Sequence, residues 1–379
     1  MPKNIVVYSD GTGQDGGVRP EQRISNVYKM YRASRVHPDN AINPAEQVAF
    51  YDPGLGTDIG ATAMTAPVRF IQKLLGSVSG RGITRNIAEC YEFIINHYEE
   101  GDRIYLVGFS RGAYTVRSLA NLLMLCGVPT RTPDGQLMRF RKSVRDIATE
   151  AVDTVLEHGA GHPRGKYETE RFEQARRFRA KYGSAAPGSN DDSNTAAYFV
   201  GVFDTVAALG ATGIRRSIIQ TGLALMFTLG VAIPAFGLSA AIVALSKLIF
   251  AIPFWWPALI GTALLVAIAN LIFWWKQRRA YRKVIRDFPN KGDFSSHEAE
   301  WKADNFDRLL SKHVKHARSA NAIDETRKDF DRVAWGTAGQ DQDLKQAWFA
   351  GNHSDVGGSY PEAESRSPTS LFNGCSRRC

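Results

Sequence analysis

The sequence has few cysteines, and none stands in a pattern that would hold a disulfide framework or a metal ion. Only four occur in 379 residues, at positions 90, 126, 375 and 379, and no C-x-x-C pair is present. A disulfide-stabilised secreted domain is therefore disfavoured, and a reducing compartment is expected. The apolar run before Asp10 is also too short for the h-region of a signal peptide, so it is interpreted as a first strand.

Acidic residues are outnumbered. The chain carries 47 Lys and Arg against 38 Asp and Glu, which gives a formal net charge of +9. Such a balance suits a nucleic acid, an anionic membrane surface or simple solubility. Because zinc fingers, RNP-like aromatic strands and dense basic helices are all missing from the sequence, we expect no nucleic-acid partner. The composition gives no indication of the oligomeric state.

Charge is almost absent from one long stretch. Between Ile218 and Trp275 only Lys247 is charged, and this stretch far exceeds the roughly 20 apolar residues that cross a bilayer. We predict a transmembrane helical hairpin over residues 217–276. Basic residues flank it on both sides, which places both ends in the cytoplasm. The alternative is a helical pair buried in a soluble esterase, as an apolar cap.

The rest of the chain has the pattern of an α/β protein. Short apolar runs read as strands and alternate with segments of helical periodicity, which favours a mostly parallel sheet with helices on both faces. The strands are predicted at 4–8, 46–51, 103–107 and 197–203, and the helices at 84–98 and 113–125. We divide the chain into a first core part (1–210), the hairpin, and a second core part (277–365).

Two polar segments are harder to assign. Residues 132–190 are rich in Arg and helical in pattern, and they are either a helical cap over the site or a solvated insertion. Residues 282–333 are charged, and we predict that they are helical in part. The run that ends at Phe349 returns to a strand, with a glycine-rich loop behind it.

The pentapeptide Gly108-Phe109-Ser110-Arg111-Gly112 joins a predicted strand to a predicted helix. This strand–serine–helix turn is how α/β-hydrolases expose a nucleophile. The turn also places Ser110 at a helix N-terminus, where the N–H of Arg111 is a natural donor to an oxyanion. The alternative is a tight turn without catalysis.

A serine nucleophile needs a base, and the base needs an acid to orient it. His353 is the best candidate base, because it follows the apolar run ending at Phe349. Asp204 is the candidate acid, since it also follows a predicted strand; the alternative is that it is the N-cap of a helix formed by the residues that follow. Asp355 competes for that role but lies only two residues from His353. The order Ser110, Asp204, His353 is that of α/β-hydrolases.

The loop Ser9–Gly13 follows the first strand and contains Asp10, Gly11 and Thr12. Its glycines let the backbone approach a ligand, so the N–H of Gly11 or Thr12 is a candidate second oxyanion donor. A phosphate-binding loop is disfavoured, because the Lys-Ser/Thr end of a P-loop is missing. We expect no cofactor and identify no metal site. Asp10 and Asp355, which lie in glycine-rich loops, are nevertheless possible ligands of a metal ion.

Five blocks in order carry a family resemblance: YSDGTGQ, YDPGLGT, GFSRGAYTVRSLA, GVFDTVAALG and WFAGNHSDVGGSYPE. Together they resemble the α/β-hydrolase domain of the first class of type VI secretion phospholipase effectors and related bacterial proteins. The resemblance implies that Ser110 is the nucleophile, Asp204 the acid and His353 the base. It also implies that the substrate is a lipid or another carboxylic ester.

The tail 367–379 departs from this resemblance. The family continues into an amphipathic helix, whereas this chain ends in SPTSLFNGCSRRC. We interpret residues 367–379 as an atypical tail and hypothesise that a frameshift produced it.

The sequence therefore predicts a membrane-anchored serine hydrolase of the bacterial inner membrane, with its catalytic domain facing the cytoplasm. Its predicted partners are a lipid or ester substrate and the bilayer. The alternatives are a hydrolase-fold membrane scaffold without activity, and a soluble esterase.

Overall fold

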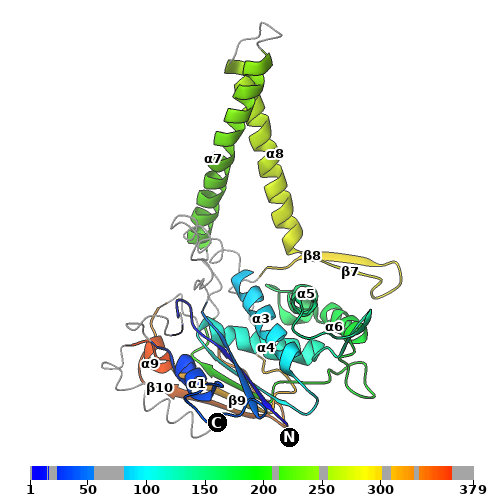
Figure 1. The fold of residues 1–379 in the computed structure, drawn as a ribbon, viewed down its shortest axis with the longest axis vertical. Helices are drawn as coiled ribbons and strands as arrows, with labels where there is room; N and C mark the ends of the chain where they lie inside the picture. The colour runs from blue at the N-terminus through cyan, green and yellow to red at the C-terminus, as the bar shows by residue number, and fades with distance from the viewer. Residues whose placement is uncertain are drawn as a thin grey trace.

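A computed structural model describes residues 2–14, 16, 24–54, 81–206, 213–246, 255–300, 309–327 and 333–360 of the chain. It consists of an α/β body from which two long helices project (Figure 1). The tail 367–379 lies outside the described residues.

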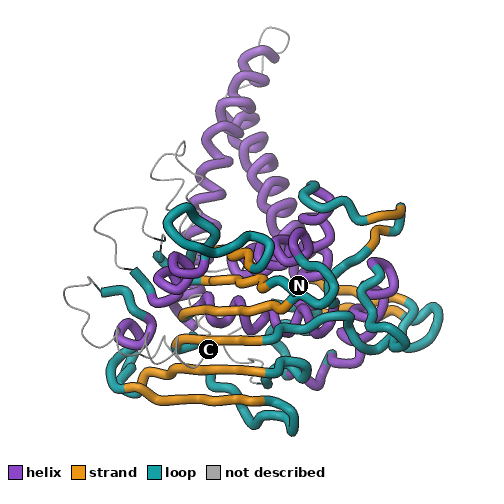
Figure 2. Tube along the Cα trace, turned by 60° about the horizontal axis from the view of Figure 1, so that its bottom comes forward, coloured by secondary structure: helices purple, strands orange, loops and turns teal. Residues whose placement is uncertain are grey.

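The body is built on a six-stranded sheet in the order β10-β9-β6-β3-β1-β2, with every neighbouring pair parallel (Figure 2). The strands are β1 (Asn4–Ser9), β2 (Gln47–Asp52), β3 (Arg103–Phe109), β6 (Phe199–Phe203), β9 (His316–Ala322) and β10 (Asp343–Phe349). The predicted strands and the parallel sheet are confirmed, and β9 is an addition. The strand order reverses between β1 and β3, and the carboxyl ends at such a switch point are where ligands bind in open α/β sheets.

Helices cover both faces of the sheet, as predicted. Alternate residues of β1 point to opposite sides, so Ile5 and Val7 join one apolar cluster while Val6 and Tyr8 join the other. The first cluster packs against α3 (Arg81–His97) and α4 (Arg111–Cys126). The second packs against α1 (Asn26–Ser34) and α9 (His353–Gly357). Burial on both sides explains why the central strands read as continuous apolar runs.

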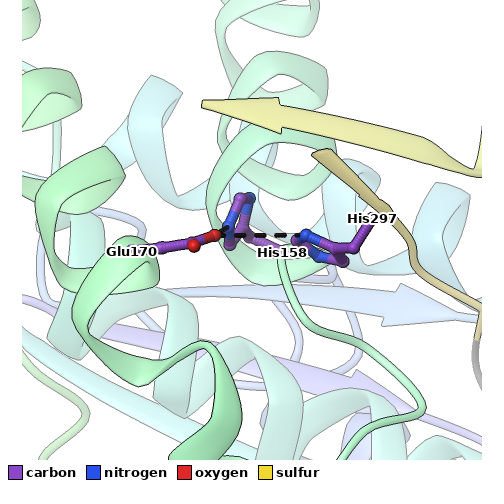
Figure 3. Close-up of side chains that lie close together, drawn as sticks. All are labelled: His158, Glu170 and His297. Carbon is purple, nitrogen blue, oxygen red and sulfur yellow. Dashed lines mark hydrogen bonds and ion pairs between the residues drawn. The ribbon is translucent and has the colours of Figure 1, made fainter. Parts of the chain in front are cut away.

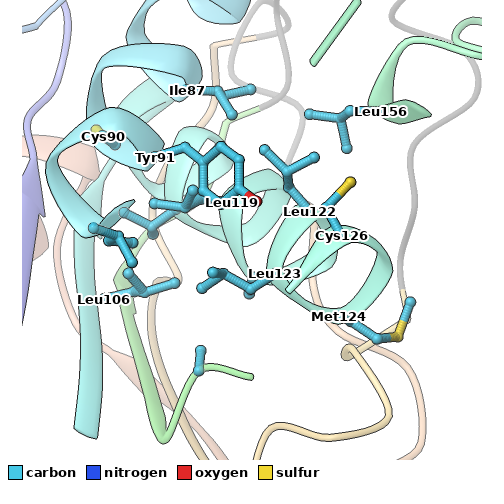
Figure 4. Packing of buried hydrophobic residues seen from close by; sticks show 14 of the residues in the cluster. Ile87, Cys90, Tyr91, Leu106, Leu119, Leu122, Leu123, Met124, Cys126 and Leu156 are labelled. Atoms are coloured by element: carbon cyan, nitrogen blue, oxygen red, sulfur yellow. The ribbon is translucent and has the colours of Figure 1, made fainter. Parts of the chain in front are cut away.

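Helix α4 is the most enclosed helix of the body, because it lies between the sheet and a further helical layer. Its side chains Leu119, Leu122 and Leu123 are fully buried beside Tyr91 of α3 (Figure 4). Burial of one such side chain stabilises the fold by roughly 1.5–3 kcal/mol.

The layer outside α4 is the predicted segment 132–190, and it packs against α3 and α4. It contains β4 (Arg131–Thr132), β5 (Gly135–Gln136), α5 (Lys142–Glu150), a π-helical turn (Ala151–Leu156), a 3₁₀ turn (Arg164–Lys166) and α6 (Glu168–Tyr182).

The prediction of helix within residues 282–333 is wrong for the residues that the structure describes. They form an antiparallel ribbon, β7 (Arg282–Arg286) with β8 (Phe294–Glu298), and then strand β9. Both ribbon strands alternate between exposed and less exposed side chains, which is the period of a strand. High charge concealed that period, since charged surface segments are compatible with either structure.

The apolar stretch forms two helices, α7 (Gly213–Ser246) and α8 (Trp255–Tyr281). They project away from the body (Figures 1 and 2). Each contains a span long and apolar enough to cross a bilayer, Ala224–Leu245 and Trp256–Lys276, and only 17% and 6% of these spans are buried. The helices meet through the stacked rings of Phe227 and Phe273, whose centroids are 4.5 Å apart.

Candidate active site

Ser110 occupies a strained turn between β3 and α4. Its backbone has φ 56° and ψ −121°, a conformation that costs a non-glycine residue of order 1–3 kcal/mol. Two hydrogen bonds hold it there: its N–H donates to the Phe203 carbonyl at 3.0 Å, and its own carbonyl accepts from the Val206 N–H at 3.3 Å. The end of β6 therefore fixes the serine from the neighbouring strand.

The two glycines of the pentapeptide are required by close packing. A Cβ on Gly108 would lie 2.5 Å from the Gly112 carbonyl oxygen. A Cβ on Gly112 would lie 2.1 Å from the Ser9 carbonyl oxygen at the end of β1. The turn can therefore settle against the ends of β1 and β3 only because both positions lack side chains.

His353 and Asp204, which are separated by 149 residues, are brought together. The Nδ1 of His353 lies 2.6 Å from Oδ2 of Asp204, and both residues are buried. The other carboxylate oxygen accepts the Ala322 N–H at 3.0 Å. Because Asp204 is held by β9, it orients the imidazole with Nδ1 as the donor, which leaves the Nε2 lone pair to accept a proton. Asp355 instead accepts the Asn352 N–H in a capping box at the start of α9.

Two residues that sequence reasoning missed also position His353. The ring of Phe109, the neighbour of Ser110, stacks on the imidazole with centroids 4.6 Å apart. The Glu325 carboxylate accepts the His353 N–H at 3.2 Å and also pairs with Arg327, which lowers the pKa of Glu325 to about 2. His353 was predicted in a loop but is the first residue of α9. The pentapeptide could have drawn attention to Phe109, whereas nothing in the sequence marks Glu325.

The Ser9–Gly13 loop lies beside the Ser110 turn, and its candidate donors are not equivalent. The Gly11 N–H already donates to Oδ1 of Asp10 at 2.7 Å, so it is engaged. Gly54 backs the loop so closely that a Cβ there would lie 1.5 Å from the Gly11 carbonyl oxygen. The loop therefore lies between the Ser110 turn and Gly54, and the Thr12 N–H, which no hydrogen bond among the described residues engages, is the remaining candidate donor.

Two buried carboxyls support this loop. Asp10 accepts hydrogen bonds from Ser25 and Tyr51, while Asp52 accepts from Ser9 and Asn86. Burial raises the pKa of Asp10 to about 6 and that of Asp52 to about 7. Both oxygens of each carboxyl are engaged by the protein's own donors. Asp10 therefore stabilises the conformation of the loop.

A separate cluster has the donor set of a metal site. His158, Glu170 and His297 place one ligand atom each within 4.8 Å of one another (Figure 3), and two His with one Glu are typical zinc ligands. However, the Gly159 N–H donates to Nε2 of His297 at 3.0 Å. The proton of the neutral ring is therefore on Nδ1, the atom that would have to bind the metal. The second ring nitrogen of a metal-ligating His normally donates its N–H, whereas Nε2 of His297 accepts a hydrogen bond. These contacts therefore favour a structural role for the cluster of His158, Glu170 and His297.

The fold and these contacts define an α/β protein whose serine turn and His–Asp pair meet at the carboxyl ends of a parallel sheet. The chain belongs to the family described as "T6SS, Phospholipase effector Tle1-like, catalytic domain", whose pattern matches residues 3–229 and 278–373. The match omits most of the hairpin and extends into the segment 367–379. An uncharacterized protein from Saccharomyces cerevisiae, YEL023C, is 33% identical over 131 residues, which are 33% of this chain and 18% of that protein.

Two solved structures are similar over nearly the whole chain. An uncharacterized protein from Pseudomonas aeruginosa has 15% identity and a TM-score of 0.38, covering 100% of this chain and 45% of that one. The Tle1 effector bound to the VgrG spike of the type VI secretion system has 16% identity and a TM-score of 0.33, covering 97% and 52%. This chain thus spans about half or less of the length of each of these three proteins.

Proposed function

We propose that this protein is a membrane-anchored serine hydrolase that cleaves carboxylic esters of lipids. The observation that carries the proposal is the buried His353–Asp204 pair, whose imidazole stacks on Phe109, the residue directly before the strained Ser110. Membership of a phospholipase effector family supports the lipid substrate.

In this mechanism Ser110 Oγ attacks the ester carbonyl while its proton passes to Nε2 of His353. Asp204 stabilises the resulting imidazolium through Nδ1. The N–H groups of Arg111 and Thr12 stabilise the oxyanion. Collapse of the intermediate releases the alcohol, which takes the proton from His353. Water, deprotonated by His353, then hydrolyses the acyl-enzyme, and the fatty acid leaves with Ser110 restored.

The hairpin supports the membrane part of the proposal. The two spans of 22 and 21 residues are each about 32 Å long, close to the roughly 30 Å of a hydrocarbon core. Their exposed apolar side chains argue against a buried cap. The start of α7, Gly213, lies only nine positions after Asp204 in the chain, a distance of at most about 32 Å. The site would therefore lie near the bilayer, on the cytoplasmic side where the basic flanks are expected. The similarity to a yeast protein means that this membrane need not be bacterial.

Labelling with a fluorophosphonate tests the activated serine. We expect the probe to label the wild type in native membranes and to fail on Ser110→Ala and His353→Ala. Equal labelling of Ser110→Ala would place the reactive serine elsewhere. A folded wild type that is not labelled would favour the inactive scaffold.

Alkaline carbonate extraction tests the anchor separately. We expect the protein to stay in the membrane pellet, whereas release into the supernatant would favour the soluble esterase.

A further inference from the structure

The β7–β8 ribbon begins immediately where α8 ends. Helix α8 runs to Tyr281 and β7 starts at Arg282, so no linker separates them. The apolar span ends at Lys276, and the six residues to Arg282 extend about 9 Å further. The headgroup layer is about 5–8 Å thick on each side of the bilayer. If α8 crosses the membrane, the ribbon therefore starts at the outer edge of the headgroups.

One face of the ribbon is fixed to the body. Ile285 is buried, Lys283 pairs with Glu157, and the Ser295 hydroxyl donates to Glu170 at 3.2 Å. His297 is held by the Gly159 N–H and stacks on Tyr167, with ring centroids 3.8 Å apart. The cluster of His158, Glu170 and His297 in Figure 3 is one of these attachments between the ribbon and the body. Both strands of the ribbon are therefore attached to the body.

The other face has side chains that suit a membrane interface. The outward residues alternate with the attached ones and are exposed; they are Arg282, Val284, Arg286, Phe294, Ser296 and Glu298. Phe294 is 56% exposed and lies opposite Arg286 in the register. An exposed aromatic ring beside a guanidinium is the combination found at the boundary between acyl chains and headgroups.

The orientation of the ribbon turns this face toward the bilayer. The ribbon extends from the foot of α8 on the side away from α7, with α5 and α6 beneath it (Figure 1). The face of the ribbon that is attached to the body points toward those helices, so its outward face points to the side on which the hairpin lies. On the outward face Arg282 and Arg286 are basic and Glu298 is acidic, and the exposed Lys276, Arg278 and Arg279 at the end of α8 precede the ribbon. Anionic headgroups attract such a segment by about 1 kcal/mol per basic residue.

We propose that the outward face of the β7–β8 ribbon docks on the anionic headgroup surface of the bilayer that the hairpin crosses. This inference rests on the proposed membrane anchor. Docking gives the body a second contact with the membrane beside α8. A hairpin alone leaves the body free to tilt, whereas the ribbon fixes the angle at which the carboxyl ends of the strands face the lipid.

The test uses the full-length protein in phosphatidylcholine vesicles that contain phosphatidylglycerol, with Cys375 and Cys379 replaced by Ser. A fluorophore is attached to Phe294→Cys, and quenching by headgroup-labelled nitroxide lipid is measured. The control is Val36→Cys, an exposed position two residues after the end of α1. We expect quenching at 294 and none at 36. The quenching should be lost in Arg282→Glu/Arg286→Glu and in vesicles without phosphatidylglycerol.

Flotation after a carbonate wash of the same vesicles separates the two proposals. Protein that floats but shows no quenching at 294 keeps its anchor and overturns ribbon docking. Quenching that persists without phosphatidylglycerol and in the double variant overturns the role of anionic lipid. Protein that does not float overturns the anchor, and ribbon docking with it.

Discussion

The two sides of the candidate site are built in different ways. The Ser110 side is one continuous stretch of chain, β3–turn–α4, whose two glycines are required by close packing. The His353 side is assembled from separate segments: Asp204 after β6, Ala322 at the end of β9, Glu325, and α9 itself. The sequence singles out Ser110, Asp204 and His353, whereas the contacts of Ala322 and Glu325 that hold the last two become visible only in the fold.

The sharpest way to test the His353 side is Asp204→Asn. The amide keeps the size of the side chain but cannot hold the imidazole in the tautomer that accepts a proton, so we expect kcat to fall by about 10⁴-fold. Asp355→Asn is the matched control, because Asp355 caps α9 and does not contact the imidazole in the described hydrogen bonds. Steady-state ester hydrolysis measures both. An equal loss in the two variants would contradict the assignment of the acid.

The Ser110 side should be intolerant at Gly112. Gly112→Ala would push a methyl group into the Ser9 and Asp10 carbonyls, and we expect a loss of about 3–5 kcal/mol or failure to fold. Gly165→Ala is the control, since a Cβ there meets nothing within 4 Å. Thermal melting in detergent compares them. A normal melting temperature for Gly112→Ala would show that the turn is looser than described.

The buried carboxyl Asp52 should make stability depend on pH. Its folded pKa is raised from 3.8 to about 7 by burial, so the folded state binds more protons between these values. The free energy of unfolding therefore falls as pH rises through that window and levels off above it. Asp52→Asn should remove part of this fall, on the order of 1–3 kcal/mol. Melting at pH 5 and pH 8 measures the difference, and an unchanged pH dependence would contradict it.

Glu325 offers the smallest of these effects. Glu325→Gln weakens the acceptor for the His353 N–H and removes the pair with Arg327, so we expect kcat/KM to fall roughly tenfold through misplacement of the base. The exposed Glu99→Gln serves as the control. As Glu325 positions His353 through the backbone, the shape of the pH–rate profile should be kept. A shifted profile would mean that Glu325 acts on the imidazole directly.

The same contrast explains which parts of the fold the sequence could predict. The strand before Ser110 and the helix after it were placed within two residues, because an apolar run, a glycine turn and a helical stripe are all local signals. Strand β9, HARSANA, was missed because its side chains are mostly small or polar, although it lies inside the sheet. The segment 282–333 is predicted to be helical in part, and it does not reveal the ribbon β7–β8, because the charged side chains conceal the strand period.

The most direct test of the central claim is phospholipid hydrolysis by the full-length protein in vesicles, comparing the wild type with Ser110→Ala. We expect release of free fatty acid by the wild type and a loss of about 10⁵-fold or more in the variant, because the nucleophile is removed while the fold is kept. Undiminished fatty-acid release by a folded Ser110→Ala protein would contradict the claim that Ser110 is the nucleophile.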